Sequence, residues 1–275
     1  MTSLTKIPKI IHQTWIQGEE MIPEELVEYK KQIQDLHKDW TYILWDEIMI
    51  LDLLKKTNKE WLKVYYKFDY LHQKVDYAKL IILYLYGGIF IDMDAYTIKK
   101  LDGLIDEYSD YDFIISYVKD INFVANYSIC RKTSQCLNNG NFLAKPDADI
   151  LKYMIDNISY KCSLFDTKIN CITKTTGPLF FNETILEYMS DNTSGTKSKI
   201  KILGNEFLEP CTLNICEVTD NTYIKHEHTQ SWINKDIQLI MKTYLEYTTT
   251  CNFCILLMFI LILYLVLSYL FKKQS

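Results

Sequence analysis

The chain has 275 residues, and its 30 Lys and Arg stand against 35 Asp and Glu, which gives a formal net charge of −5. At roughly one to two hundred residues per domain, this length fits one large domain or two small ones. The 48% share of hydrophobic residues, with only 8 Gly and 5 Pro, excludes a disordered or collagen-like chain. The acidic balance and the lack of a basic block argue against a nucleic-acid partner, because phosphate contacts need clustered Lys and Arg.

The first third of the chain is predicted to contain two strands and four helices. Apolar residues of strand type at 7–16 predict a buried first strand. Pro23 fits the first turn of an amphipathic helix, which should run to about residue 38. A strand at 41–45 and three helices follow, at 46–56, 58–66 and 72–86. The last helix should end at Gly87 and Gly88, because glycine readily adopts the left-handed conformation that ends helices.

A hydrophobic strand at 89–92 then runs straight into Asp94. Beyond it we predict four strands, at 112–117, 141–144, 199–203 and 223–225. We also predict two helices, one at 148–158 and one that begins after Gly177 and Pro178. Strands that alternate with helices predict a mostly parallel sheet covered on both faces. In such sheets the ligand lies beyond the carboxyl ends of the strands. With no internal repeat and no linker-like segment before residue 247, residues 1–246 are predicted to form one α/β domain.

The C-terminal part has a different character. Residues 253–271, FCILLMFILILYLVLSYLF, include no charged side chain. A helix of this length spans roughly 28 Å, close to the thickness of the bilayer hydrocarbon. A buried core helix is the alternative, but core helices rarely run this far without a polar face. We therefore predict that residues 247–275 form a single-pass transmembrane anchor with a short dibasic tail.

The side of the membrane stays open. The tail, Lys272-Lys273-Gln274-Ser275, resembles a retrieval signal of the endoplasmic reticulum, and the positive-inside rule would keep it in the cytosol with the large domain in a lumen. No stretch near Met1 resembles a signal peptide, and a protein with its span at the extreme C-terminus usually leaves its body in the cytosol. We predict a membrane of the endoplasmic reticulum or Golgi system, with the orientation undetermined. Sequons at Asn126, Asn157, Asn182 and Asn192 would be usable only in the lumen.

The eight cysteines do not have the spacing of a metal site. They form no CxxC…CxxC pair, and the single CxxC, Cys251 and Cys254, adjoins the predicted span. A structural zinc ion needs four closely spaced ligands. Buried thiols or a few disulfides are therefore the expectation.

The strongest chemical pattern lies at residues 86–94, YGGIFIDMD. A hydrophobic strand runs into two carboxylates, Asp92 and Asp94, and the period of two along a strand would point both to one face, about 7 Å apart at their Cα atoms. Oxygen ligands of this kind suit Mg²⁺ or Mn²⁺ carrying a diphosphate. The alternative is a pair of solvated aspartates at a strand end.

A second cluster comes late in the chain, where His226, His228, Ser231 and Trp232 follow one another. Imidazole suits Mn²⁺, and serine or indole donors can hold a leaving phosphate. Both histidines would lie on one face of an extended segment, so both are candidate metal ligands, with His228 slightly favoured.

Four segments in order resemble glycosyltransferase family 32. Residues 76–102 resemble its DxD region, and residues 7–18, IPKIIHQTWIQG, resemble its opening strand. Thr176-Gly177-Pro178 and the HxHxxSW run at 226–232 complete the resemblance, which covers roughly residues 7–232. The family includes yeast-type mannosyltransferases of glycan and sphingolipid synthesis, and its sugar-binding region is similar to that of the large clostridial toxins.

The resemblance implies a GT-A-like, Rossmann-type nucleotide-sugar-binding domain. It also implies retaining transfer of a sugar from a nucleotide-sugar donor, GDP-mannose or a UDP-sugar, to a glycan or lipid acceptor. The implied cofactor is Mn²⁺ or Mg²⁺. A non-catalytic nucleotide-sugar or glycan-binding protein with the same fold is the main alternative, and a metal-dependent phosphohydrolase is a weaker one, because such sites need further carboxylates and a nucleophile.

The resemblance also implies roles for single residues. Asp94 would bind the metal directly, and Asp92 would hydrogen-bond the ribose or donor sugar and complete the metal set with the late histidines. Trp15 would stack on the base, and Asp76 would accept hydrogen bonds from sugar hydroxyls. The implied catalytic residues are thus Asp76, Asp92 and Asp94.

Other implied donor contacts are less direct. Lys79 would lie near the diphosphate or sugar, but the family usually has Arg there, and Lys cannot make the bidentate contact of a guanidinium. Ser231 and Trp232 would hold the leaving phosphate. His12 would lie near the donor by resemblance, or in the core by its apolar surroundings. Asn138-Asn139-Gly140 resemble an acceptor-side loop.

Overall fold

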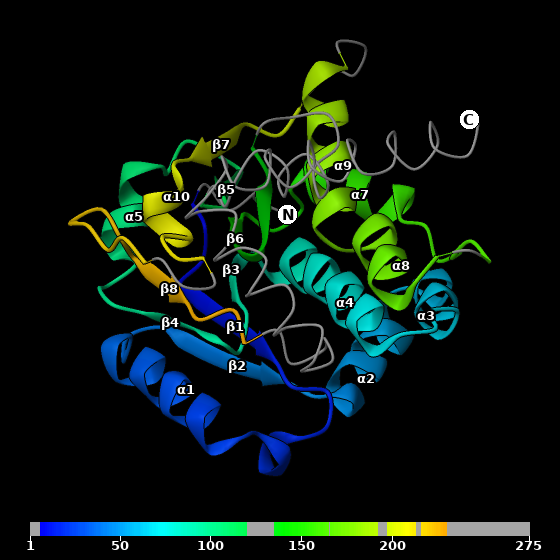
Figure 1. Cartoon of the computed structure of the whole chain (residues 1–275), viewed down its shortest axis with the longest axis horizontal. Coiled ribbons are helices and arrows are strands. Elements are labelled where there is room, and N and C mark those ends of the chain that lie inside the picture. Colours follow the sequence, from blue (N-terminus) through cyan, green and yellow to red (C-terminus); the bar gives the residue numbers. More distant parts are fainter. Residues whose placement is uncertain (1–5, 120–134, 165, 192–196, 213–215, 230–275) are drawn as a thin grey trace, which may run out of the picture. The chain divides into compact units, whose positions relative to one another are not determined.

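The computed structural model describes residues 6–119, 135–164, 166–191, 197–212 and 216–229, and Figure 1 shows their arrangement. The elements of the first hundred residues are β1 (Ile10–Thr14), the 3₁₀ helix η1 (Glu19–Met21), α1 (Glu24–Leu36), β2 (Thr41–Trp45), α2 (Glu47–Thr57), α3 (Lys59–Tyr66), α4 (Leu71–Tyr86), β3 (Gly88–Ile91) and β4 (Ala95–Thr97). The later elements are α5 (Asp102–Glu107), β5 (Phe113–Tyr117), β6 (Leu137–Ala144), α7 (Asp149–Asn157), α8 (Lys168–Thr175), α9 (Pro178–Ser190), β7 (Ile200–Leu203), α10 (Asn205–Leu208) and β8 (Ile224–His226).

A six-stranded mixed sheet forms the centre of the fold, in the order β2-β1-β3-β6-β5-β7. The pairs β1–β2, β1–β3 and β5–β7 are parallel, whereas β6 runs antiparallel to both of its neighbours, β3 and β5. The prediction of a mostly parallel α/β sheet is confirmed. A separate two-stranded ribbon pairs β4 with β8 in antiparallel register.

Alternate residues along the central strands build two cores, one on each face of the sheet. Phe90, Phe113 and Phe142 pack in one hydrophobic cluster, beneath α2, α3, α4, α7 and α9. Their strand neighbours Ile89 and Leu143 pack in the other, against residues of α1, α5 and α10. Figure 1 shows α4, α7, α8 and α9 gathered on one side and α1, α5 and α10 on the other. This is the burial on both faces that apolar strands of an α/β sheet require.

The glycine pair between α4 and β3 lets the central strand begin directly after the helix. Gly87 and Gly88 have φ of 63° and 99°. A Cβ on Gly88 would collide with the carbonyl oxygen of Ile10 on the neighbouring strand, and one on Gly87 would lie 2.6 Å from Cδ of Pro146. The glycines therefore serve both the helix end, as predicted, and the close approach of β1 to β3.

Several elements differ from the predictions. β4, α5, α8 and α10 were not predicted, and β6 begins at Leu137 rather than at residue 141. Asn138-Asn139-Gly140 therefore lie in a strand and not in a loop. Asparagine and glycine favour turns, but here Leu137 pairs with Tyr117 of β5 and Asn141–Ala144 pair with β3, so the residues between them are extended by the pairing at both ends.

Some predictions concern segments outside the described residues. The domain boundary at 246/247 and the apolar stretch 253–271 belong to this group, and both stay predictions. In the described ranges, we find no helix that combines the length and the apolar character needed to cross a bilayer. The structure pairs Cys162 with Cys171 and Cys211 with Cys216, which favours disulfides over thiols for these four residues. Of the sequons, Asn182 is 1% exposed on α9.

Candidate metal centre

The DXD residues lie in a turn that follows β3, not in the strand itself. The amide of Ala95 donates to the carbonyl of Asp92 over 3.0 Å, and this closes the turn. The period-two argument for Asp92 and Asp94 was therefore wrong, because neither residue is in extended strand. Their carboxylates converge nevertheless: one oxygen of each and one nitrogen of His226 all lie within 4.8 Å of one another.

The ribbon of β4 and β8 brings His226 to the turn. Ala95 pairs with His226, and the amide of Glu227 donates to the carbonyl of Asp94 over 2.9 Å. Nε2 of His226 then lies 3.0 Å from Oδ1 of Asp94. β4 is three residues long and follows the turn directly. Its pairing with β8 therefore brings the late histidine motif next to the DXD motif.

Asp94 is held as an anion. Thr229 donates to its Oδ2 from both the amide and the hydroxyl, each over 2.9 Å. Burial alone would raise the pKa of Asp94, but the imidazolium of His226 and the two Thr229 hydrogen bonds outweigh burial and hold that pKa well below its usual range. A permanently charged carboxylate is the form that ligates a cation.

Asp92 has a different environment. Burial raises the pKa of Asp92 to about 6, and the positive charges of Lys79 and His226 oppose that rise. Its backbone is fixed on both sides: Gln13 Nε2 donates to its carbonyl over 3.2 Å, and its amide donates to Oδ1 of Asn141 over 3.3 Å. The turn is thus tied to β1 and to β6.

Asp76 and Lys79 lie on one face of α4, as their spacing predicts. Lys79 is 2% exposed, and its ammonium lies 3.0 Å from Asp76 Oδ1, 3.4 Å from Asp92 Oδ1 and 2.9 Å from the carbonyl of Asn139. These contacts use all three donors of the ammonium. Thr176, from the predicted Thr-Gly-Pro motif, donates to Asp76 Oδ2 over 2.9 Å. Two of the family-like motifs therefore meet at a buried ion pair next to the DXD turn.

Glu209 is a site residue that the sequence did not suggest. It follows α10 and is fully buried. Its Oε2 lies 3.1 Å from His226 Nδ1, and its Oε1 lies 2.5 Å from His228 Nε2. The pKa of Glu209 is lowered to about 2, because the two imidazoles outweigh the effect of burial. An acidic residue within the apolar run from Phe207 to Cys211 was the one available signal.

The two histidines face different partners. His226 contacts Asp94 and Glu209 through its two ring nitrogens. His228 adopts a left-handed φ of 51°, stacks on the His226 ring at 4.0 Å, and contacts Glu209 and the carbonyl of Cys211. Of the two, His226 is the one placed beside the DXD carboxylates, so the slight preference for His228 does not match the geometry.

Trp15 and His12 were both predicted to lie near the donor, but their surroundings in the structure differ. Trp15 directly follows β1, is partly buried against the cluster that contains Met93 of the DXD turn, and its indole N–H has no partner among the described residues. His12 is fully buried, with Nε2 2.9 Å from the Gly87 carbonyl and Nδ1 accepting from Trp45 over 3.1 Å. Both ring nitrogens of His12 are used, so the core alternative fits better than a donor contact. Ser231 and Trp232 lie outside the described residues.

Burial of His12 predicts a loss of stability in acid. Burial lowers its pKa to about 4, against about 6.5 in an unfolded chain. The stabilisation is full above about pH 6.5 and is lost as the pH falls toward 4, a difference of about 3 kcal/mol. Urea unfolding at about pH 7 and about pH 4 should show that His12→Gln, which keeps a donor for Gly87, loses less stability on acidification than the wild type. Equal losses in the two proteins would contradict a neutral buried His12.

The space between the carboxylates and the imidazole depends on Gly140 of β6. A Cβ there would lie 2.7 Å from Asp92 Oδ2 and 3.2 Å from His226 Cε1. The residues present therefore fit a cation: two carboxylates and an imidazole converge, and Gly140, where a side chain would enter the space between them, has none. Such a set of oxygen and imidazole donors suits Mn²⁺ and tolerates Mg²⁺.

Gly140→Ala should therefore impair activity more than stability. The new methyl would displace the ends of three side chains, those of Asp92, Asn138 and His226, rather than backbone, so we expect a small change in melting temperature. A displacement of about 1 Å at a reacting site can cost about 100-fold in rate. The matched control is Gly103→Ala on α5, where a Cβ would lie 3.0 Å from the Tyr223 hydroxyl, among residues that are not part of this centre. Equal activity of the two variants would show that Gly140 does not keep the site open.

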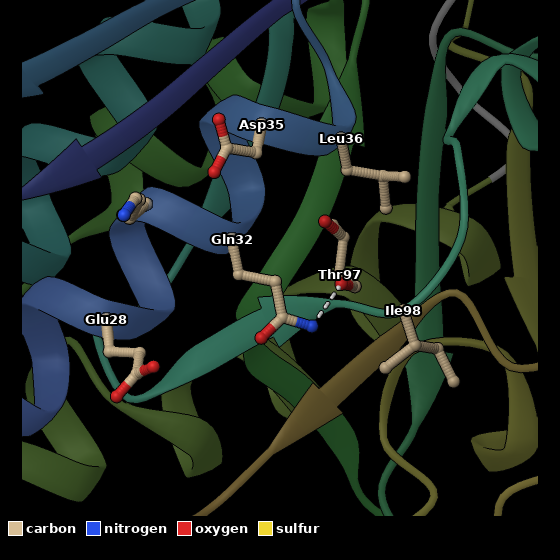
Figure 2. A pocket seen from close by; sticks show the side chains of 7 residues that line it. Glu28, Gln32, Asp35, Leu36, Thr97 and Ile98 are labelled. Atoms are coloured by element: carbon tan, nitrogen blue, oxygen red, sulfur yellow. Dashed lines mark hydrogen bonds between the residues drawn. The ribbon is translucent and has the colours of Figure 1, made fainter.

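A surface hollow lies elsewhere, between α1 and β4, and Figure 2 shows its lining. Gln32 from α1 donates to the carbonyl of Thr97 across it over 3.2 Å, with Glu28, Asp35 and Ile98 around them. None of the residues of the metal centre lines this hollow.

Comparison with known proteins shows that the DXD residues lie in a region that matches a known family model. Residues 23–111 match the model of the "glycosyltransferase sugar-binding region containing DXD motif". An uncharacterized glycosyltransferase of Acanthamoeba polyphaga mimivirus is 29% identical over 231 residues, which cover 82% of this chain and 84% of that protein. Inositol phosphoceramide mannosyltransferase 1 of Schizosaccharomyces pombe is 28% identical over 189 residues, 68% of this chain and 53% of that protein.

A mannosyl phosphorylinositol ceramide synthase of Saccharomyces cerevisiae is 38% identical over 99 residues, 36% of this chain and 26% of that protein. The chain thus matches about half or less of these fungal relatives. Among solved structures, the PaToxG glycosyltransferase has a TM-score of 0.45 at 15% identity, covering 66% of this chain and 70% of that chain. Residues 23–111, which include the DXD turn, thus match a DXD-type glycosyltransferase sugar-binding region, and the mimivirus relative, which matches over most of both chains, is named a glycosyltransferase.

Proposed function

We propose that the chain is a metal-dependent, retaining glycosyltransferase that moves a hexose from a nucleotide-sugar donor to a glycan or lipid acceptor. The observation that carries the proposal is the convergence of Asp92, Asp94 and His226 at the end of the central strand β3. The mixed sheet with this turn at a strand end is consistent with a GT-A-like fold. The names of the fungal relatives favour GDP-mannose as the donor and an inositol-containing lipid as the acceptor, with a UDP-sugar as the other donor candidate.

Asp94, Asp92 and His226 would hold Mn²⁺ or Mg²⁺, with His228 as a further candidate ligand. When bound, the cation would neutralise the negative charge that develops on the departing diphosphate. Asp94 is suited to direct ligation because Thr229 donates two hydrogen bonds to its Oδ2 and helps to keep it ionised. His226 would give up its Nε2 proton on binding the cation, because only the neutral imidazole is a ligand. Asp92 has a side chain that is 30% exposed, so it can also reach the ribose or the donor sugar.

The remaining residues would bind and orient the donor. Trp15 would stack on the base, and its indole N–H, which has no partner in the part of the chain that the structure describes, is available to the donor. Asp76 would accept hydrogen bonds from sugar hydroxyls, although Lys79 and Thr176 now occupy its oxygens. Lys79 would hold Asp76 and Asp92 in place through its ion pairs with them, in addition to lying near the diphosphate. Ser231 and Trp232 would donate to the leaving phosphate.

We assign no carboxylate as nucleophile. The acceptor hydroxyl would attack the anomeric carbon from the face that the diphosphate leaves, which retains the configuration. The contribution of the protein is then mainly to hold donor and acceptor in reacting geometry and to stabilise the leaving group.

The test is release of nucleotide from a panel of GDP- and UDP-sugars, with Mn²⁺ and with chelator. We expect turnover of one donor class that needs the metal and that Asp94→Ala abolishes. Turnover that survives Asp94→Ala would argue against the proposal. Titration with GDP and UDP, with and without Mn²⁺, distinguishes an enzyme from a non-catalytic binding protein. Tight binding without turnover of any donor would favour a non-catalytic nucleotide-sugar-binding protein.

We also propose that residues 253–271 attach the protein to a membrane of the endoplasmic reticulum or Golgi system. The uncharged sequence supports this proposal. Carbonate extraction of the full chain should leave it in the membrane pellet, and release into the supernatant would contradict it. The glycosylation state of Asn126 would report the side of the membrane.

A further inference from the structure

Glu209 is a buried carboxylate, and none of the contacts that the structure describes for it comes from a lysine or arginine. Its side chain is fully buried, and four polar side chains surround it. Their distances are 2.6 Å from Asn138 Nδ2, 3.4 Å from Asn141 Nδ2 and 3.1 Å from His226 Nδ1, all to Oε2, and 2.5 Å from His228 Nε2 to Oε1. A buried charge costs several kcal/mol unless its surroundings compensate it. A neutral residue would avoid that cost, which suggests that the charge of Glu209 has a function at this position.

One route leads from Glu209 to Asp94 through His226. A carboxylate only accepts hydrogen bonds, so Glu209 requires a proton on Nδ1 of His226. With Nδ1 so engaged, the other nitrogen, Nε2, is directed at Asp94 over 3.0 Å. Glu209 thereby sets both the ring orientation and the nitrogen that faces the DXD carboxylates.

A second route leads from Glu209 to Asp92 through Asn141. The amide nitrogen of Asn141 faces Glu209, and its oxygen accepts the backbone N–H of Asp92 over 3.3 Å. Because Glu209 can only accept, it fixes which end of the Asn141 amide points to the DXD turn. Asn138 holds the same carboxylate oxygen and also accepts the amide of Gly140 over 2.7 Å.

We propose that Glu209 is a positioning residue of the metal centre, which holds His226 and the DXD turn in the geometry that binds the cation. The inference rests on the proposed function, since it assigns Glu209 to the centre formed by Asp92, Asp94 and His226. Metal-binding histidines generally donate their second N–H to a carboxylate or carbonyl, and loss of that partner typically weakens metal binding about 10–100-fold. Glu209 does not contact the donor or the cation in this assignment.

The test is a titration of the full chain with Mn²⁺, without donor or acceptor. Electron paramagnetic resonance measures the free ion and hence the fraction bound. Glu209→Gln is nearly isosteric but lacks the charge, and we expect it to bind Mn²⁺ about 10–100-fold more weakly than the wild type. The matched control is Glu227→Gln. Glu227 is next to His226 in sequence, but its carboxylate contacts Tyr96 and Lys225 instead. Equal affinity of wild type and Glu209→Gln would overturn the proposal, and so would equal weakening by Glu227→Gln.

A second readout does not depend on whether Glu209→Gln folds. In the wild type labelled with ¹⁵N-histidine, added Mn²⁺ should broaden the Nε2 resonance of His226 before the Nδ1 resonance, because Nδ1 faces Glu209. Earlier broadening of Nδ1 would overturn the assignment. Glu209→Asp, which restores a carboxylate on a shorter side chain, should bind Mn²⁺ better than Glu209→Gln. If the wild type itself binds no Mn²⁺ and turns over no donor, the proposed function fails, whereas a failure of Glu209 alone leaves wild-type binding and turnover intact.

Discussion

Replacement of Asp94 by Asn should lower the rate of sugar transfer by about a thousandfold or more. Asn keeps the size of the side chain and can still accept from Thr229, so the turn should survive. What disappears is the anionic oxygen beside His226 that would ligate the cation. A bound metal contributes several kcal/mol of transition-state stabilisation, and each 1.4 kcal/mol, roughly, is a factor of ten in rate.

The measurement is kcat and kcat/KM for nucleotide release at saturating Mn²⁺, with Glu60→Gln as the matched control. The Glu60 side chain is 74% exposed and pairs with the neighbouring Lys63 of α3, so its loss should leave turnover unchanged. The Mn²⁺ concentration for half-maximal activity should rise in Asp94→Asn. Wild-type turnover of Asp94→Asn, or the same loss in Glu60→Gln, would exclude Asp94 as a ligand.

The strand and helix pattern could be predicted from the sequence where the local signal agreed with the tertiary environment. The strand at 41–45 matches β2, and the helix expected at 72–86 is observed as α4, Leu71–Tyr86. In both cases apolar residues recur at the period of the element and a turn signal marks an end. β6 was predicted four residues short because Leu137-Asn138-Asn139-Gly140 has no strand pattern. In the fold Leu137 pairs with Tyr117 of β5, and the register with β3 begins at Asn141, so the segment between is extended by its two ends.

The candidate site could be predicted in part. Asp92, Asp94 and the late histidines were found because their residue types and spacing point to a cation. How they meet could not be predicted, because the short pairing of β4 with β8 depends on the three-dimensional path of the chain between them. Glu209 was missed for the same reason: one carboxylate in an apolar run has no local partner, and its meaning appears only when β6 and β8 converge on it.

Lys79 shows how burial changes the interpretation of a residue. From its spacing, the pair with Asp76 could equally be a surface ion pair of little consequence. In the fold, Lys79 is 2% exposed and Asp76 is 7% exposed, and the ammonium also lies 5.2 Å from the centre of the Phe90 ring. The pair is thus part of the core directly beneath the DXD turn.

We therefore expect Lys79→Met to destabilise the fold by about 3–5 kcal/mol, because it leaves buried carboxylates without a counter-charge. Met nearly conserves the volume, so a cavity does not explain the loss. Burial already raises the pKa of Asp76, and Lys79 and Thr176 oppose that rise. Without Lys79 the pKa of Asp76 should rise further, so the destabilisation should be largest at neutral pH and should diminish as the pH falls and Asp76 takes up a proton.

Urea unfolding of Lys79→Met, Asp76→Asn and the double variant tests this account as a double-mutant cycle. The double variant removes the ammonium and one carboxylate together, so it should be more stable than Lys79→Met alone even though it carries one more substitution. Lys79→Arg keeps the charge and should fold, at the cost of fitting a larger group beside Phe90. If the effects of Lys79→Met and Asp76→Asn simply add, the two side chains are not coupled, and the core beneath the DXD turn does not depend on their charges.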